Sequence, residues 1–158
     1  MDDDPPRVYA LITTYMRNEL LRTRSLPSIK IQSRPVDGVI LVDDSTDRSV
    51  REENHRIFDS YFQSDMDHVY LVNERTPGAA GSWNHGLNWL NIRCPEAWVA
   101  ILDDDDEWTE DHIASCLHIC SNVDLVLSSI KTIKNGSDIG IRTPENMTLN
   151  GFYAGNPG

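Results

Sequence analysis

Four short runs of β-branched and aromatic residues recur along the chain at intervals of thirty residues, ending at positions 13, 43, 73 and 103. One βα unit takes about thirty residues, and the segments between the runs carry apolar residues at helical spacing. The runs are continuously apolar, which is typical of parallel strands covered on both faces. The repeat therefore predicts an α/β fold with a mainly parallel sheet flanked by helices, its strands at residues 8–13, 39–43, 69–73 and 98–103.

The pattern changes after Asp124. Residues 125–134 have the composition of a strand, Asn135-Gly136 is a typical two-residue turn, and residues 137–142 are the partner strand. This order predicts a β-hairpin near the C-terminus. Residues 143–158 contain two prolines and three glycines without periodicity, which predicts an irregular tail.

The composition excludes several classes of protein. Fourteen Lys and Arg against 25 Asp and Glu give a net charge of −11, which disfavours nucleic acid and anionic membranes as partners. No apolar run approaches the ~20 residues of a transmembrane segment. Residues 1–6 are acidic and proline-rich, unlike a signal peptide, and we expect a disordered leader there. Three cysteines without disulfide spacing suit a reducing compartment, so we expect a cytoplasmic protein.

Acidic residues directly follow two of the predicted strands. Asp43 and Asp44 close the second strand, and residues 103–107 are five consecutive acids at the end of the fourth. Ligands of open parallel sheets bind at the carboxyl ends of the strands. Carboxylates this close repel one another unless a cation or hydrogen-bond donors relieve the repulsion. We therefore expect these acids to belong to a binding site.

The order of the acids indicates which of them share a ligand. On an extended backbone alternate side chains point the same way, so Asp103 and Asp105 would face one ligand and Asp104 would point elsewhere. Oxygen ligands alone select Mg²⁺ or Mn²⁺. An EF-hand is excluded because Ala114 occupies the place of its bidentate glutamate. A phosphatase-type aspartate nucleophile is disfavoured because Glu107 stands where a small hydroxyl residue is expected.

Four segments together resemble the inverting glycosyltransferases of family 2, which have the Rossmann-like, nucleotide-sugar-dependent GT-A fold. They are ALITTYMRNELL at residues 10–21, VILVDDSTD at 39–47, residues 73–78 with Asn84 and Gly86, and AILDDDDEW at 100–108. Each segment is a weak signal alone, but all four occur in the family's order and at its spacing. The resemblance covers residues 7–134.

The resemblance implies a nucleotide site at the carboxyl end of the sheet. Tyr15 would stack on the base, Thr13 would hydrogen-bond it, and Asp43 would accept from a base N–H. Asp44 belongs to the same nucleotide-binding set, and Asp104 would lie near the ribose. The donor would be a nucleoside-diphosphate sugar, with UDP-sugars the commonest in the family.

The resemblance also implies a cofactor and a reaction. Asp105, helped by Asp103, would hold Mn²⁺ or Mg²⁺ between the two phosphates, where the cation stabilises the departing nucleoside diphosphate. An acceptor hydroxyl would displace that group with inversion at the anomeric carbon. Family members carry their general base in a second half of the protein, so no residue of this chain matches it and we expect it beyond Gly158.

Three positions depart from the family's pattern. Met16 stands where the family usually has Asn, Ser45 where it often has Gly, and Trp83 in place of an Arg. That Arg is a possible phosphate contact, and Arg17 and Arg75 are the candidates to replace it.

These observations predict a metal-dependent inverting glycosyltransferase of which this chain is the donor-binding portion. Residues 1–6 are the leader, residues 7–142 the nucleotide-sugar-binding domain, and residues 143–158 the start of an acceptor-binding half. A nucleotidyltransferase is one alternative, although it would need a glycine-rich basic loop after the first strand, and residues 15–18 contain no glycine. A noncatalytic nucleotide-binding or regulatory module is the other.

Overall fold

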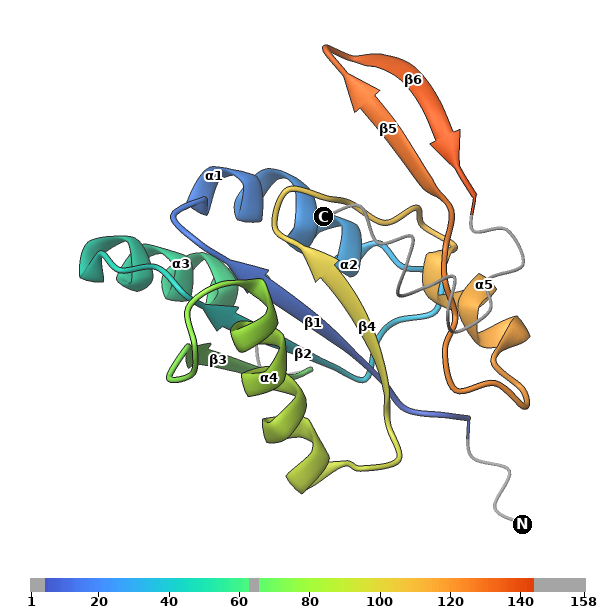
Figure 1. Cartoon of the computed structure of the whole chain (residues 1–158), viewed down its shortest axis with the longest axis horizontal. Coiled ribbons are helices and arrows are strands. Elements are labelled where there is room, and N and C mark those ends of the chain that lie inside the picture. The colour runs from blue at the N-terminus through green and yellow to red at the C-terminus, as the bar shows by residue number, and fades with distance from the viewer. Residues whose placement is uncertain (1–4, 63–65, 144–158) are drawn as a thin grey trace. The chain divides into compact units, whose positions relative to one another are not determined.

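The structure is a computed structural model that describes residues 5–62 and 66–143. The chain divides into two compact units, one ending at Ser115 and the other beginning at Cys116. The first unit contains a four-stranded sheet and its helices, and the second contains the end of helix α5 (His112–Ile119) and a hairpin (Figure 1). The predictions for residues 1–4 and 144–158 lie outside the described residues.

The four strands of the first unit confirm the predicted repeat. They are β1 (Val8–Thr14), β2 (Gly38–Asp43), β3 (Asp67–Val72) and β4 (Trp98–Asp103). Their order in the sheet is β3-β2-β1-β4, and each neighbouring pair is parallel. The chain therefore winds from β1 out to β3 and then returns to the other side of β1. This reversal places a topological switch point between β1 and β4, which is where open α/β sheets bind ligands.

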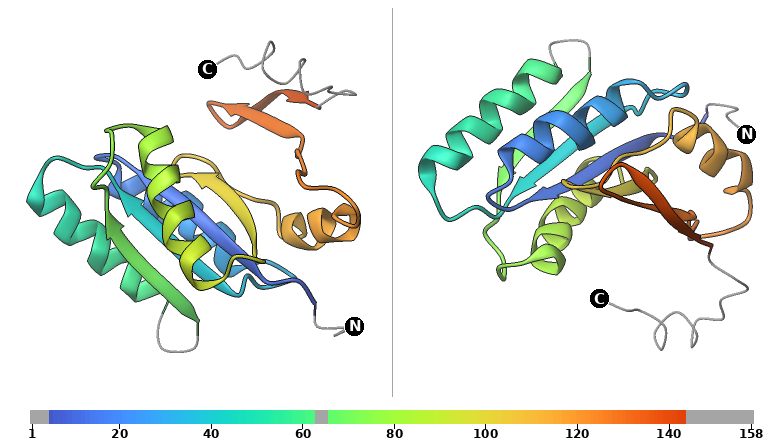
Figure 2. Two further views of the ribbon diagram at one scale, coloured as in Figure 1. Left: turned by 60° about the horizontal axis from the view of Figure 1, so that its bottom comes forward. Right: turned by 90° about the horizontal axis from the view of Figure 1, so that it is seen from above.

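Helices cover both faces of this sheet, as the apolar strands require (Figure 2). One face carries α1 (Asn18–Leu20), the short π-helix η1 (Leu21–Ser25), α2 (Leu26–Lys30) and α3 (Arg48–Tyr61), and the other carries α4 (Ala79–Arg93). Strands β1 and β2 are buried along their whole length. None of the helices in the described ranges is long and apolar enough to cross a membrane.

The hairpin of the second unit confirms the predicted turn but corrects the first strand. Strand β5 (Ile130–Lys134) pairs antiparallel with β6 (Ser137–Arg142). Asn135 and Gly136 have φ values of 51° and 75°, the conformation that two-residue hairpin turns favour. The predicted first strand began too early, because residues 125–129 have no ladder partner.

Gly86 allows helix α4 to approach the sheet closely. A Cβ atom at this position would collide with the Leu11 side chain and lie 3.2 Å from Val42 Cγ2. Leu11 and Val42 belong to the core cluster that Leu90 of α4 completes. The packing of this helix therefore requires a residue without a side chain at position 86.

We predict that Gly86→Ala lowers the free energy of unfolding by about 1–3 kcal/mol, because an overfilled core must displace side chains or backbone. Urea unfolding followed by tryptophan fluorescence measures the change. Asn88→Ala, at an exposed position of the same helix, is the matched control and should change stability by less than about 0.5 kcal/mol. Equal midpoints for Gly86→Ala and wild type would show that α4 does not pack this closely.

Candidate functional site

The register of the sheet brings the two predicted acidic clusters to one edge. Thr13 of β1 lies beside Val42 of β2 on one side and Asp103 of β4 on the other. Thr14 lies beside Asp43, the last residue of β2. The carboxylates that follow β2 and β4 therefore flank the end of β1, which is the arrangement that the sequence predicted.

The five-acid run is a turn rather than a continued strand. Strand β4 ends at Asp103, and the Asp106 N–H donates to the Asp103 carbonyl at 3.1 Å. The extended backbone assumed for these residues in the sequence analysis is therefore wrong. Asp104 is only 4% exposed, while Asp103 and Asp105 lie nearer the surface. That Asp103 and Asp105 face one ligand stays a prediction.

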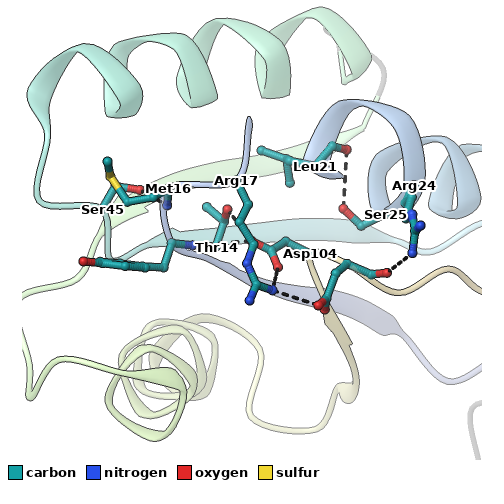
Figure 3. A network of polar contacts seen from close by, with 10 residues as sticks. Thr14, Met16, Arg17, Leu21, Arg24, Ser25, Ser45 and Asp104 are labelled. Carbon is teal, nitrogen blue, oxygen red and sulfur yellow. Dashed lines mark hydrogen bonds and ion pairs between the residues drawn. The ribbon is translucent and has the colours of Figure 1, made fainter. Parts of the chain in front are cut away.

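Hydrogen bonds to the Asp104 carboxylate hold this turn at the end of β1. Asp104 Oδ2 accepts from Thr14 Oγ1 at 2.8 Å and from the Tyr15 N–H at 3.4 Å. Its Oδ1 accepts from Arg17 Nη1 at 3.2 Å, and the same nitrogen donates to Asp105 Oδ2 at 2.8 Å (Figure 3). The two carboxylates raise the pKa of the Arg17 guanidinium. Arg17, one of the two candidate phosphate contacts, thus lies directly on the acidic turn.

Negative charge is crowded around this turn. Burial raises the pKa of the Asp103 carboxyl, and the carboxylates of Asp106 and Asp105 raise it further. Burial and the Asp105 carboxylate likewise raise the pKa of Asp106, against the opposing charge of Arg24. Folding therefore makes ionisation of these acids less favourable than in water, and an added cation would relieve that cost.

Asp43 does not take the role that the resemblance implied. The residue is fully buried, at 0% exposure. Its Oδ1 accepts from the Ser45 N–H at 2.8 Å, and its Oδ2 accepts from Asn54 Nδ2 at 2.8 Å and Tyr70 OH at 2.6 Å. Because Asp43 exposes no surface that a base could reach, the predicted contact with a base N–H does not fit this structure. Asp43 instead fixes the loop after β2 against α3 and β3.

Asp44 is the member of the pair that reaches the surface. It is partly exposed, and it accepts from Asn73 Nδ2 at 2.7 Å and from the Gly78 N–H at 2.6 Å. These two bonds hold the segment between β3 and α4 beside β2. Asn73 and Gly78 both match the family's motif. The Asn73 side chain supplies one of these bonds, and Gly78 has a φ of 104°, which favours glycine.

The segment after β1 carries Tyr15 into solvent. The Tyr15 side chain is 53% exposed, whereas Thr13 is 9% exposed. Met16 has a φ of 57°, and its N–H donates to Ser45 Oγ at 2.9 Å. Asn adopts this left-handed conformation far more readily than other non-glycine residues. The conformation explains why an Asn is usual here, and it shows that Met16 holds the turn under strain.

Trp83 is another departure from the family's pattern, and Arg75 is the second candidate to replace the family's Arg. Trp83 packs against the core cluster beneath α4, so the position of the family's Arg serves packing here. Arg75 lines a cavity of about 460 Å³ beside α4, together with Asn84, Asn88 and Cys94.

The comparisons with known proteins agree with this geometry. The family model described as glycosyl transferase family 2 matches residues 9–155, and the chain belongs to that family. The succinoglycan biosynthesis protein ExoW of Rhizobium meliloti is 24% identical over 75% of this chain. The galactofuranosyltransferase GlfT1 of Mycolicibacterium smegmatis is 30% identical over 73% of this chain.

These relatives are much longer than the chain. The matched region spans 35% of ExoW and 35% of GlfT1. Among solved structures, S. aureus TarS matches 69% of this chain and 18% of its own, with 21% identity and a TM-score of 0.47.

We predict that Met16→Asn raises the free energy of unfolding by about 1 kcal/mol, because it relieves the left-handed strain of a side chain that packs little. Met16 is 42% exposed, so the lost contacts are few. The shift of the urea midpoint measures the gain. Met66→Asn, at a partly buried position just before β3, is the control and should bring no gain. A destabilised Met16→Asn variant would contradict the strain.

We predict that Tyr70→Phe lowers the free energy of unfolding by about 1.5–3 kcal/mol at pH 7, the range for a hydrogen bond to a charged group. Burial, with the hydrogen bond to Asp43, raises the pKa of the Tyr70 hydroxyl above its ordinary value of 10.0. The protonated hydroxyl therefore stabilises the fold fully below pH 10, and this contribution declines as the pH rises further.

Unfolding curves from pH 7 to 11 test this prediction. The gap between wild type and Tyr70→Phe should narrow above about pH 10. Tyr61→Phe is the matched control, because its hydroxyl donates to the Arg22 carbonyl at an exposed site. A gap for Tyr70→Phe that is no larger than for Tyr61→Phe would show that the Asp43 contact is unimportant.

Proposed function

We propose that the edge formed by β1, β2 and β4 binds the nucleoside-diphosphate part of a sugar donor. The whole protein then transfers the sugar to an acceptor hydroxyl, with a divalent cation and with inversion. The observation that carries the proposal is the position of the acidic turn, which Asp104 fastens to Thr14 at the switch point between β1 and β4. Family membership supports the reaction class.

The exposed side chains support a nucleotide position at one end of this edge. Tyr15 offers a solvent-facing ring on which a base can stack. Asp44 is partly exposed and its oxygens have lone pairs beyond the two bonds they accept. Asp44 is thus the acceptor for a base N–H, in place of the buried Asp43. We expect uridine as the base.

The acidic turn suits a hard cation. Asp103 and Asp105 present only oxygen donors, and Mg²⁺ or Mn²⁺ bind proteins through one or two carboxylates and take their remaining ligands from water and substrate phosphates. In the described part of the chain, no three His, Cys, Asp or Glu residues lie together as a set that could hold a metal. The diphosphate would therefore complete the coordination. A bound cation would stabilise the charge that develops on the leaving diphosphate.

The relatives and the local sequence favour sugar transfer over the alternatives. One relative is by name a galactofuranosyltransferase, and the turn after β1 has none of the glycines that a nucleotidyltransferase loop would need. The three free cysteines support the expected cytoplasmic location.

Calorimetric titration of UDP, GDP and dTDP into the purified chain with Mn²⁺ tests the proposal. We predict that one nucleotide binds, that a chelator abolishes binding, and that Asp105→Asn weakens it at least tenfold, about 1.4 kcal/mol. Glu107→Gln removes the same charge two residues away at an exposed position and should weaken binding less than about threefold. The proposed site would be contradicted if no nucleotide binds, or if neither the chelator nor Asp105→Asn changes the nucleotide affinity.

A further inference from the structure

We propose that Arg17 binds the acidic turn as an internal counter-ion and that the cation displaces it from Asp105 when the donor binds. This inference rests on the proposed function. Arg17 and the divalent cation compete for the Asp105 carboxylate. Once displaced, the Arg17 guanidinium binds the diphosphate of the donor.

Arg17 contacts two carboxylate oxygens, Asp104 Oδ1 and Asp105 Oδ2, on the residues that are implied to bind the donor and its cation. One nitrogen, Nη1, lies 3.2 Å from Asp104 Oδ1 and 2.8 Å from Asp105 Oδ2. Asp104 is the carboxylate implied for the ribose, and Asp105 is the carboxylate implied for the cation. Of the Asp104 oxygens, Oδ2 is already engaged by Thr14. Displacement of Arg17 would therefore release both acceptors together.

The backbone aims Arg17 at this position. The left-handed Met16, anchored by its N–H to Ser45 Oγ, directly precedes it. Arg17 itself is not yet helical and stands at the N-terminal boundary of α1. Strained residues persist where the surrounding structure holds them, and they cluster at functional sites. Figure 3 shows the resulting side chain reaching from the end of β1 across to the acidic turn.

The ion pair is placed where it can be exchanged. The side chains of Arg17 and Asp105 are 50% and 46% exposed, and solvent-exposed ion pairs contribute little to stability. A divalent cation at Asp105 carries twice the charge of the guanidinium and repels it at short range. The released guanidinium stays near the phosphates that this cation binds, and its planar fork matches phosphate geometry.

Arg24 provides a matched comparison on the same turn. Its Nη1 donates to the Asp105 backbone carbonyl at 2.9 Å, not to the carboxylate. It supplies positive charge near the site without occupying a proposed cation ligand. Replacing either arginine removes one charge, but only the replacement of Arg17 uncovers the Asp104 and Asp105 oxygens.

Two binding constants test this displacement. Both are measured on the full chain for wild type, Arg17→Met, Arg17→Lys and Arg24→Met. The first is the affinity for Mn²⁺ alone, from the free-ion signal in electron paramagnetic resonance. The second is the affinity for the nucleoside diphosphate at saturating Mn²⁺, from calorimetry. We expect Arg17→Met to bind Mn²⁺ about threefold to tenfold more tightly and the nucleotide more weakly by a similar factor.

The controls separate this role from a structural one. Arg24→Met should change Mn²⁺ affinity less than Arg17→Met does, and Arg17→Lys should stay closer to wild type because it keeps the charge. An Arg17→Met variant that binds both ligands more weakly, or Mn²⁺ with unchanged affinity, would overturn the displacement while leaving the proposed donor site intact. Failure of wild type to bind nucleotide with Mn²⁺ would overturn both.

Discussion

The hydrogen bond from Thr14 Oγ1 to Asp104 Oδ2, 2.8 Å long and buried, joins the end of β1 to the acidic turn after β4. The two strands are 90 residues apart in the sequence at this contact, and the sheet register alone brings them together. Without this bond the buried Asp104 would lose a hydrogen-bond donor in a region already rich in carboxylates. The position of Asp105 and its contact with Arg17 follow from the placement of this turn.

Much of this architecture could be predicted from the sequence because it depends on local patterns. The thirty-residue spacing of apolar runs gave the parallel strands, and the Asn135-Gly136 pair gave the hairpin turn. Asp43 shows where such reasoning stops. Its partners, Asn54 and Tyr70, come from α3 and β3, and no sequence pattern indicates that those side chains converge on one buried carboxylate. The identical neighbours Asp43 and Asp44 differ only through burial, which depends on tertiary structure.

The site also shows how folding and ligand binding place opposite demands on the same residues. Met16 holds a left-handed backbone that few side chains adopt readily, and the carboxyls of Asp103 and Asp106 have pKa values raised by burial and mutual repulsion. Both features oppose folding, and the buried strands β1 and β2 with their two helical layers offset them. Arg17 relieves part of the repulsion at the site that we propose for the cation. We therefore infer that a bound cation displaces Arg17 from Asp105.

The most direct test is whether cation and nucleotide meet at the edge formed by β1, β2 and β4. Mn²⁺, added with a nucleoside diphosphate, broadens the NMR signals of backbone amides near its binding site. We expect broadening to concentrate on the backbone amides at residues 14–17, 44–45 and 103–107 and to spare the distant ends of the same strands. Broadening centred elsewhere, such as at the His55 and Asp59 pair on α3, would contradict it.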